Sequence, residues 1–565
     1  MNNTWFHRNN YKKIEDVILS HISEEEMNDC TEYIIKNIDK AAEQIRIFMK
    51  KKKIIWIIGD YDCDGIMASS ILKLTFETLG YKVTVRLPKR FSEGYGLSEK
   101  IVQEIPKNAV IITVDNGIAA ASAIKLAKEK GCYVLLTDHH LAPINNKKEP
   151  VYPDADMIID PKAIPNSCDF TDFCGATIAF KLAKALLGKD HSLIPALESL
   201  AGIATIADVM PLIRENRQIV LRTLNTLMTR KSTLGINLLL DILEMQYITE
   251  TDIGYQIGPI INASGRMMDD GASFILEIVS CNDIKKQNWL MSAIEQAIQT
   301  NDDRKVIQKN CLTRVLDHIK QKQMQQDFPL CVYEDNVPEG IIGILAGRLA
   351  ELYKTPCLVF SNTENETISK GSARSYNDVH LKKMLDEHAD LFSKYGGHAG
   401  AAGMSIPTKK IDILRNVLKE TIIKQGYKQD FNNYYDIEMS AKYIPIVLQK
   451  LLPYAPFGEH NAPIIFKIKD FTLDGTKGFY EYLGDENQHL KLYGQNGINA
   501  LHFNTNIVID KKNIALTWEI YGELSYNYYN GVFSPQIIML GGYPKKQQTS
   551  SGLLLSLNEK GKNRY

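Results

Sequence analysis

Short apolar runs alternate with helix-periodic stretches in the first third of this chain, and this alternation limits the possible folds more than any other feature. The apolar runs cover residues 54–58, 83–87, 110–114 and 133–136, and the clearest helical stretches cover 68–79 and 119–130. Strands that alternate with helices form βαβ units, whose parallel sheet is covered on both faces. Right-handed crossovers place the carboxyl ends of such strands at one edge, where ligands bind. The sequence therefore predicts an α/β fold with a site at that edge.

Acidic residues and histidines follow three of these predicted strands. In chain order they are Asp60, Asp62, Asp64, Asp115, His139 and His140. Asp208 lies amid apolar residues; alone it reads as a helix break or cap, but with the others it is a further candidate. Carboxylates that are brought together repel one another unless a cation lies among them.

Two kinds of metal site can be compared with this pattern. An EF-hand calcium loop also begins Asp-x-Asp-x-Asp-Gly, but here its twelfth position is Ile71 rather than Glu, and a strand precedes it. A site rich in oxygen ligands with an imidazole and no thiolate suits Mn²⁺ or Mg²⁺. Two ions that share a carboxylate would serve in-line phosphoryl displacement. The sequence therefore favours a two-metal site for phosphoryl chemistry.

Composition restricts the class of protein. The chain has 565 residues, or roughly three to four domains at about 150 residues each. Its 44% hydrophobic and 24% charged residues exclude a disordered chain, a collagen-like fibre and a coiled coil. No apolar run approaches the ~18 residues of a membrane helix, and no secretory signal is recognisable. Nine cysteines without CxxC spacing favour a reducing cytoplasm, and a net charge of −1 gives no global basic excess for nucleic acid.

The rest of the chain divides into further regions. Residues 1–50 are predicted to be helical, and 284–323 form a long, polar, helix-periodic stretch. A second α/β region begins at residue 330, and the part after residue 434 has the pattern of a small antiparallel barrel. The elements expected there are strands at 330–333 and 357–360, a helix at 343–353, and strands at 464–468, 517–524 and 536–540.

Two arginines and a histidine are candidate phosphate ligands. Arg266 follows Asn-Ala-Ser-Gly, a turn signal, and Arg374 lies in a predicted turn of small residues. His398 lies in the glycine-rich segment 396–403, where backbone N–H groups can form an anion nest. Phosphoester hydrolysis needs cations and donors directed at the phosphate. Each residue is equally compatible with an ordinary solvated turn, and the glycines with close backbone packing.

Four ordered motifs resemble the DHH phosphoesterase superfamily. They are Asp-Tyr-Asp-Cys-Asp-Gly (60–65), Val-Asp-Asn-Gly (114–117), Asp-His-His (138–140) and Ala-Asp-Val-Met-Pro-Leu (207–212). Further segments are similar to its RecJ family of single-strand-specific exonucleases. These are Ile-Asn-Ala-Ser-Gly-Arg (261–266), Glu-Gly-Ile-Ile-Gly-Ile (339–344), Gly-Ser-Ala-Arg-Ser (371–375), Gly-Gly-His-Ala-Gly-Ala-Ala-Gly (396–403) and Pro-Phe-Gly (456–458).

The resemblance implies a role for each candidate residue. Two Mn²⁺ or Mg²⁺ ions would be held by Asp60, Asp62, Asp64, Asp115, His139 and Asp208. Asp62 would hold the first ion, Asp64 the second, and Asp115 would bridge them; His139 and Asp208 would complete the second site, while Asp60 would ligate or support the ligands from behind. His140, Arg266, Arg374 and His398 would contact the substrate phosphate.

The resemblance also implies a domain organisation. The fold would be a two-lobed α/β DHH phosphoesterase, with a parallel-sheet lobe and a smaller DHH-associated lobe joined by a long helix, followed by a C-terminal OB-fold β-barrel. The implied segments are an N-terminal helical segment (1–50), a DHH catalytic domain (51–225), a helical linker (226–329), a DHH-associated domain (330–430), an OB-fold nucleic-acid-binding domain (431–545) and a flexible tail (546–565).

The implied activity is 5′ to 3′ hydrolysis of single-stranded DNA to 5′-mononucleotides, in DNA repair and recombination. Single-stranded DNA is the implied partner, with a single-strand-binding protein and a helicase by resemblance; a cytoplasmic monomer is expected. One alternative, another DHH phosphoesterase acting on short oligonucleotides or a pyrophosphatase, leaves about 120–130 residues after Tyr434 unexplained. The other alternative is a non-catalytic DHH replication scaffold. Such a protein would lack some of the metal-binding carboxylates, whereas Asp62, Asp64, Asp115 and Asp208 are all present in this sequence.

Overall fold

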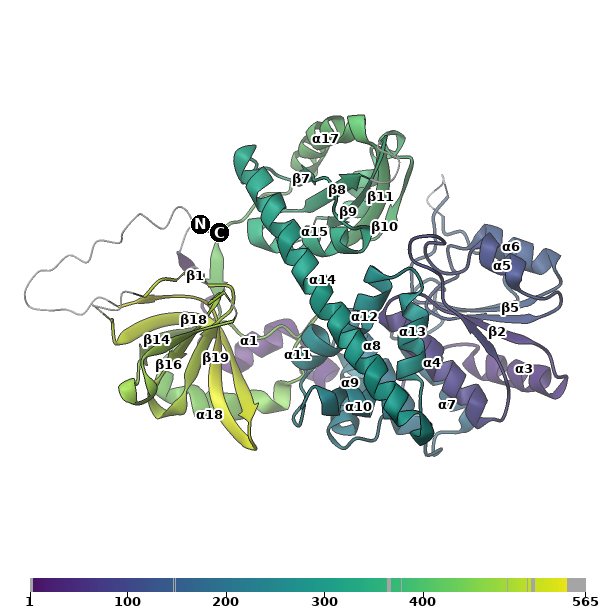
Figure 1. The fold of residues 1–565 in the computed structure, drawn as a ribbon, viewed down its shortest axis with the longest axis horizontal. Coiled ribbons are helices and arrows are strands. Elements are labelled where there is room, and N and C mark those ends of the chain that lie inside the picture. The colour runs from purple at the N-terminus through teal and green to yellow at the C-terminus, as the bar shows by residue number, and fades with distance from the viewer. Residues whose placement is uncertain are drawn as a thin grey trace, which may run out of the picture. The chain divides into compact units, whose positions relative to one another are not determined.

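The structure is a computed structural model that describes residues 4–545, except 146, 148, 363–366, 378, 485, 506 and 510–513. The expected flexible tail, 546–565, lies outside the described residues. The chain folds into two compact units (Figure 1). We call residues 31–210 and 218–431 the central unit, and residues 4–30, 211–217 and 432–545 the terminal unit.

A five-stranded parallel sheet forms the first lobe of the central unit. Its strands, in spatial order, are β3 (Thr84–Arg86), β2 (Ile55–Ile58), β4 (Val110–Thr113), β5 (Tyr133–Thr137) and β6 (Met157–Ile159). Every pair is parallel, so all five carboxyl ends lie at one edge. Four of these strands lie within one residue of their predicted bounds, and β6 was not predicted.

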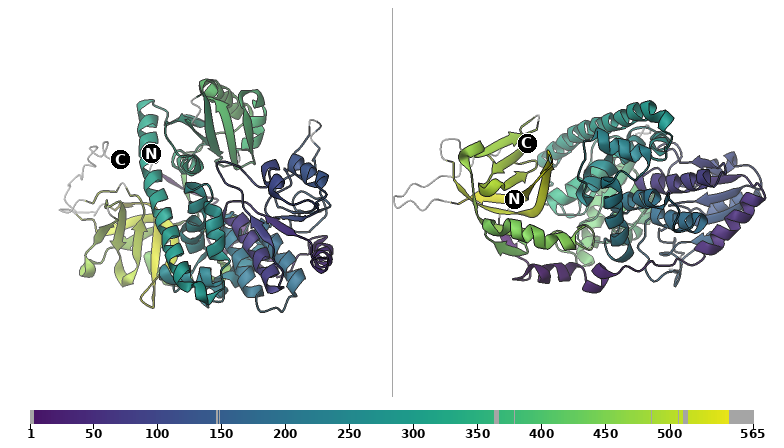
Figure 2. Two further views of the ribbon diagram at one scale, coloured as in Figure 1. Left: turned by 45° about the vertical axis from the view of Figure 1, so that its right-hand side comes forward. Right: turned by 90° about the horizontal axis from the view of Figure 1, so that it is seen from below.

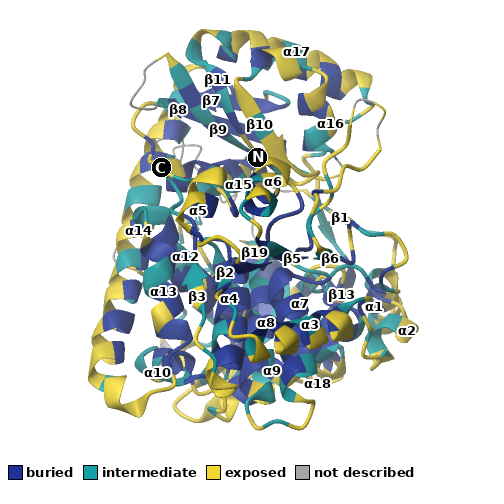
Figure 3. Ribbon diagram, turned by 90° about the vertical axis from the view of Figure 1, so that its right-hand side faces the viewer, coloured by how far each residue is buried: buried dark blue, intermediate teal, exposed yellow. Residues whose placement is uncertain are grey.

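Helices cover both faces of this sheet. One side carries α5 (Glu99–Glu104) and α6 (Ala121–Glu129), whose apolar residues join a core with Ile58, Ile111 and Val134. The other carries α3 (Ile38–Lys50), α4 (Cys63–Thr78) and α7 (Gly175–Leu187), with α8 (Ile194–Ala207) packed on α4 and α7 (Figure 1). The helices α4, α7 and α8 are largely buried (Figure 3). The predicted helix 68–79 begins earlier, because the Asp62 carboxylate caps α4 by accepting the amide of Gly65.

A group of helices follows, from α9 (Arg214–Met228) through α10 (Leu234–Ile242) and α11 (Glu250–Asp252) to α12 (Gly258–Met267) and α13 (Gly271–Val279). The long helix α14 (Gln287–Gln321) occupies most of the predicted stretch 284–323 and packs against α10, α12 and α13 (Figure 2). Arg266 lies in the last turn of α12, so the expected turn is wrong. The small residues before it instead allow a close approach, since a Cβ on Gly265 would lie 2.8 Å from the carbonyl oxygen of Tyr61.

The second lobe of the central unit contains a five-stranded mixed sheet. Its order is β10 (Lys394–Gly397), β11 (Ala401–Pro407), β9 (Ile368–Arg374), β8 (Cys357–Asn362) and β7 (Leu330–Tyr333). Helices α14 and α15 (Glu339–Tyr353) cover one face, while α16 (Leu381–Asp386) and α17 (Ile411–Lys424) cover the other.

Two sequence expectations are corrected in this lobe. Arg374 is the last residue of β9 rather than part of a turn, because residues 368–374 pair with both β8 and β11. The glycine-rich segment 396–403 forms a β-hairpin, in which His398 opens the connection between β10 and β11. Glycine and alanine residues form the paired positions of this hairpin, and His398 lies at its tip.

The terminal unit contains a seven-stranded sheet with the OB fold. Its order is β13 (Ile437–Met439), β14 (Phe466–Thr472), β18 (Thr517–Tyr529), β19 (Val532–Pro544), β17 (Asn499–His502), β16 (His489–Tyr493) and β15 (Tyr480–Leu483). A bridge between Leu473 and Gly494 connects the ends of β14 and β16. Helix α18 (Ile444–Leu451) contacts β18 and β19.

The N-terminal segment is not helical throughout, in contrast to the expectation for residues 1–50. Its first element is β1 (Trp5–His7), which pairs in parallel with β12 (Asn433–Tyr435). Helices α1 (Ile14–His21) and α2 (Glu24–Asn28) follow. Trp5 stacks on Tyr521, with ring centroids 4.4 Å apart, and this contact favours an extended segment against the barrel.

No helix among the described residues has the length and apolar character needed to cross a membrane.

Candidate active site

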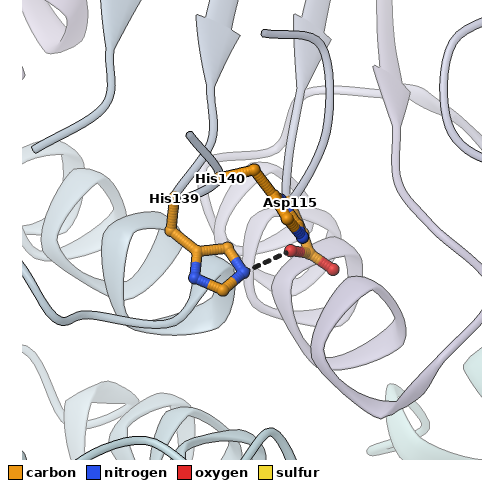
Figure 4. A group of neighbouring side chains, drawn as sticks. All are labelled: Asp115, His139 and His140. Carbon is orange, nitrogen blue, oxygen red and sulfur yellow. Dashed lines mark ion pairs between the residues drawn. The ribbon is translucent and has the colours of Figure 1, made fainter. Parts of the chain in front are cut away.

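The edge formed by the carboxyl ends of β2, β4 and β5 carries most of the predicted site residues. Asp60 follows β2, Asp62 caps α4, and Asp64 lies in the first turn of that helix. Asp115 follows β4 with a positive φ of 61°, a backbone conformation uncommon outside glycine. The chain thereby turns sharply at Asp115 and leaves its carboxylate facing His139 (Figure 4).

Helix α7 fixes the carboxylate of Asp64. The backbone amides of Gly175 and Ala176 donate to its two oxygens, over 2.6 and 2.7 Å. These are orphan amides of a helix N-terminus, where a negative charge is stabilised. Gly175 is also required by space, since a Cβ there would lie 2.5 Å from the Cβ of Asp115. One helix end thus holds two of the candidate ligands in place.

His139 is the point on which three of the carboxylates converge. Its Nε2 lies 3.1 Å from Asp115 Oδ1, 3.6 Å from Asp64 Oδ2 and 3.7 Å from Asp208 Oδ2. Asp208 ends α8 as its C-cap, so it is both a helix end and a member of this cluster. Burial, with the nearby charge of His140, lowers the pKa of His139 to about 4. The imidazole is therefore neutral near pH 7, as a metal ligand must be.

The carboxylates are poorly compensated by protein groups. Burial and the charge of Asp62 raise the pKa of Asp60, and burial with the charge of Asp64 raises the pKa of Asp115 and of Asp208. Asp60 Oδ2 is buried and has no hydrogen-bond partner among the residues that the structure describes. Buried carboxylates in such numbers require compensating positive charge.

The ligand atoms form compact sets that fit hard divalent cations. Asp60, Asp62 and Asp115 each place an oxygen within 4.8 Å of the others, and so do Asp64, His139 and Asp208 with their ligand atoms. Asp115, His139 and His140 form a third such group. The donors are carboxylate oxygens and imidazole nitrogens, the set that suits Mn²⁺ or Mg²⁺.

His140 has a different environment from His139. Its Nδ1 donates to Asp138 Oδ1 over 2.7 Å and lies 3.2 Å from the hydroxyl of Tyr95. Burial lowers the pKa of His140, but the hydrogen bond and charge of Asp138 outweigh it, and the pKa rises to about 9. His140 is therefore protonated near pH 7. The ring of His398, from the second lobe, stacks against it with centroids 5.4 Å apart.

Two partners of His140 have no role in the expectations from sequence. Asp138 is the first residue of the Asp-His-His motif; it is buried and also accepts the amides of His139 and Ile118. Tyr95 comes from the segment after β3, and its hydroxyl donates its proton to the Asp115 carbonyl. The position of Asp138 in the motif could have indicated its role, whereas no local pattern singles out Tyr95.

The two predicted phosphate-binding arginines are joined by a third. Burial and the charges of Arg90 and Arg374 lower the pKa of Arg266 to about 10, and burial and Arg90 lower the pKa of Arg374. Arg90 lies over the ring of Tyr61 at 4.5 Å and was not predicted. Three cations in a partly buried place are a candidate binding site for an anion. Arg90 lies over the ring of Tyr61, and Gly265, which precedes Arg266, approaches the Tyr61 carbonyl, so the arginine cluster adjoins the Asp60–Asp62 side of the centre.

The terminal unit has a cavity of about 570 Å³ on its barrel. It is lined by β16, the turn before β17 and the hairpin of β18 and β19, through residues that include Lys491, Tyr493, Asn527 and Tyr529. The Lys491 ammonium lies 4.9 Å from the ring centre of Tyr493. An aromatic ring beside a cation and amide side chains is the combination that OB folds use for single strands.

Three sequence profiles match the chain. Residues 54–207 match the DHH family, N-terminal domain; residues 327–424 match the DHHA1 domain; and residues 435–540 match the RecJ OB domain.

Curated relatives match over most of the chain. The single-stranded-DNA-specific exonuclease RecJ of Dickeya dadantii is 31% identical over 408 residues, which is 68% of this chain and 68% of that protein. The RecJ of Haemophilus influenzae is 30% identical, over 67% of each chain. The RecJ of Bacillus subtilis is 30% identical over 89% of this chain, which spans 63% of that relative.

Solved structures show the same fold. RecJ of Thermus thermophilus in complex with Mn²⁺ superposes with a TM-score of 0.74 at 22% identity, over 93% of this chain and 74% of that one. A second structure of that protein contains Mg²⁺. An exonuclease RecJ bound to manganese has a TM-score of 0.58 at 25% identity, over 70% of this chain and 96% of that one.

Proposed function

Since this chain belongs to the RecJ family, we propose that it is a metal-dependent exonuclease that hydrolyses single-stranded DNA from the 5′ end and releases 5′-mononucleotides, in DNA repair and recombination. The observation that carries the proposal is the convergence of three carboxylates, two of them buried, on neutral His139 at the carboxyl edge of the parallel sheet. The relatives named above are single-stranded-DNA-specific exonucleases.

Six residues would hold two divalent cations, Mn²⁺ or Mg²⁺. Asp60 and Asp62 would hold one ion, Asp64, His139 and Asp208 the other, and Asp115, which lies close to both sets, would bridge them. When bound, such ions supply an activated water and neutralise charge on the phosphate. The amides of α7 keep Asp64 oriented, so the ligands remain in place before substrate binds.

His140 and the arginine cluster would act on the substrate. His140, protonated and held by Asp138, donates a hydrogen bond to the scissile phosphate as its negative charge develops. His398 would approach the same phosphate from the second lobe. Arg90, Arg266 and Arg374 would bind a neighbouring phosphate of the strand, which relieves their mutual repulsion.

The terminal unit would bind the single strand beyond the active site. Its cavity, with Lys491 and Tyr493, offers a stacking surface and a cation for the backbone. We further propose a single-strand-binding protein and a helicase as partners, and a monomer acting in the cytoplasm. None of the nine cysteines, all of which lie among the described residues, takes part in a disulfide, as suits a reducing compartment.

The alternatives receive less support. A DHH phosphoesterase for short oligonucleotides would not account for the RecJ OB domain match at 435–540. A non-catalytic scaffold would not need a complete set of carboxylates around His139.

End-labelled DNA tests the proposal. The protein should degrade single strands and leave blunt duplex intact, only when Mn²⁺ or Mg²⁺ is added, and a 5′ label should appear as a mononucleotide at the earliest times. Asp115→Ala, the matched control, should lose this activity and keep the fold, because the shared ligand is removed. A 3′ label released first would refute the polarity, and wild-type turnover by Asp115→Ala would refute the two-metal centre.

A further inference from the structure

A lysine on the same sheet edge has no role in the mechanism so far. Strand β6 is the neighbour of β5 in the sheet, and Asp138 donates its amide to the carbonyl of Ile159, the last residue of β6. Asp160 follows and is buried, and its Oδ1 accepts the amides of Lys162 and Ala163 over 3.0 and 2.8 Å. This tight turn fixes the backbone of Lys162 just after the carboxyl end of β6, next to the carboxyl end of β5.

Lys162 and the arginine cluster lie on opposite sides of the metal centre along the sheet. The strand order is β3-β2-β4-β5-β6, and all five carboxyl ends share one edge. The metal-site candidates at strand ends follow β2, β4 and β5, the three middle strands. Arg90 follows β3 at one end of this row, and Lys162 follows β6 at the other. Positive groups therefore lie on two flanks of the metal centre.

The two flanks differ in accessibility. Arg90, Arg266 and Arg374 are partly buried, and the 5′ end of the strand would bind there. Lys162 is exposed, and its ammonium pairs with Asp172 Oδ1 over 3.5 Å, with side chains 34% and 39% exposed. A pair so open to water is weak, so a phosphate can replace the carboxylate. The open flank is where the remaining strand would leave the site.

Resting on the proposed exonuclease function, we propose that Lys162 binds the backbone phosphate that follows the scissile phosphate on its 3′ side. The strand would then be held at three points: its end at the arginine cluster, the scissile phosphate at the metal centre, and the next phosphate at Lys162. A substrate with only two phosphates would lack the third contact.

Binding without catalysis tests this inference. The ligand is a short oligothymidylate with a 5′ phosphate and a 3′ fluorescein, in which the second internucleotide linkage is either natural or a neutral methylphosphonate; anisotropy is measured in EDTA. For the wild type, the methylphosphonate should weaken binding about tenfold, the effect of one charged hydrogen bond. The Lys162→Met variant should bind the natural ligand about as weakly as the wild type binds the methylphosphonate, and it should bind both ligands with the same affinity. If the substitution and the methylphosphonate each weaken binding independently, so that their effects multiply, the proposal is overturned.

Cleavage provides the second measurement. Lys162→Met should lower kcat/KM about tenfold on a 5′-phosphorylated trinucleotide and leave the dinucleotide, which has no phosphate beyond the scissile one, unchanged. Lys162→Arg should restore most of the trinucleotide rate. Lys107→Met, which removes an exposed lysine next to the amino end of β4, is the matched control and should change neither. Equal losses on both substrates would refute the role of Lys162. If the wild type cleaves neither the trinucleotide nor the dinucleotide, the proposed nuclease function fails. The anisotropy measurements on the two ligands then still decide whether Lys162 binds the phosphate.

Discussion

Two adjacent histidines differ in protonation state near pH 7, His139 being neutral and His140 cationic, because their neighbours differ. His139 is buried beside His140 and its pKa falls to about 4, whereas the carboxylate of Asp138 raises the pKa of His140 to about 9. Adjacent side chains at a strand exit point in different directions, so one faces the carboxylates and the other faces Asp138 and Tyr95. The chain thus provides a neutral ligand and a cationic donor at consecutive positions.

Substitution should separate these two roles. His139→Ala should lower Mn²⁺ affinity roughly 10–100-fold, and excess Mn²⁺ should restore part of the activity. His140→Ala should bind Mn²⁺ nearly as the wild type does but lower kcat by roughly 10²–10³, because a hydrogen bond to the transition state is lost. Calorimetric Mn²⁺ titration and single-turnover kinetics on both variants measure this. If His140→Ala loses a metal ion and His139→Ala binds metal fully, then His140 is the metal ligand and His139 contacts the phosphate.

The sequence predicted which candidate metal ligands lie together at the sheet edge, but it did not predict the residues that surround them. Asp60, Asp115 and His139 each follow a strand, so their place at one edge depends only on the alternating pattern and the handedness of crossovers. Arg90 and Tyr95 belong to an irregular segment between β3 and α5. Their proximity to the site depends on how that segment folds back, and no local periodicity encodes this.

At the scale of elements, the close contact between α7 and the turn after β4 holds the site together. Gly175→Ala would place a Cβ 2.5 Å from the Cβ of Asp115, so helix or turn must move. We expect the free energy of unfolding to fall by about 1–3 kcal/mol and Mn²⁺ affinity to fall with it. Urea unfolding and metal titration measure the two effects.

Gly254→Ala is the control for that substitution. Gly254 also lies in a helical segment, but its added Cβ would meet only Ile206 Cγ2, at an ordinary 3.6 Å. This variant should be neutral or slightly stabilised, since alanine loses less entropy in a helix. Equal behaviour of the two variants would show that the space at Gly175 is not critical.

The short strand β1 should contribute to the stability of the terminal unit. Trp5→Ala removes the ring stacked on Tyr521, and we expect a loss of about 1–3 kcal/mol from lost stacking and burial. Differential scanning calorimetry of the full chain should show a lower Tm for the transition that includes the barrel. Leu19→Ala, at an exposed position of α1, is the control. An unchanged transition in Trp5→Ala would mean that β1 is only a peripheral attachment.

Element prediction succeeded where apolar patterns were long. The predicted strands 517–524 and 536–540 lie within β18 and β19, whose outer halves are half-buried or exposed, so that the buried apolar pattern does not show their full length. β1 was missed because it has three residues and its partner β12 is far away in the chain. Short strands are specified by their partners rather than by their own sequence.

At the scale of the whole molecule, the terminal unit is assembled from three separated parts of the chain. Arg217 shows the consequence, since its guanidinium donates to the carbonyls of Pro453, Tyr454 and Ala455. Truncation near Tyr434 would therefore leave residues 4–30 and 211–217 without the barrel residues that belong to the same unit. Substitutions in the barrel cavity are a cleaner test of DNA binding.

We expect Tyr493→Ala with Lys491→Ala to weaken binding of long single strands by roughly 10–100-fold and to flatten its salt dependence. Cleavage of a dinucleotide should be nearly unaffected, because it does not extend beyond the active site. Anisotropy on long oligonucleotides at several salt concentrations, with dinucleotide kinetics in parallel, measures this. Lys442→Ala, outside the cavity lining on the same unit, is the control. Equal losses on long and short substrates would indicate a structural role for the cavity.

The pairing of β1 with β12 also has a consequence for synthesis. The paired residues Trp5 and Asn433 are 428 positions apart, so the ribosome releases the first long before it makes the second. At 5–20 residues per second, the nascent segment waits roughly 20–90 s for its partner strand. During that interval the indole of Trp5 is exposed, and the early chain is available to chaperones. The central unit can complete its sheets meanwhile, so the barrel is the last part of the molecule to become native.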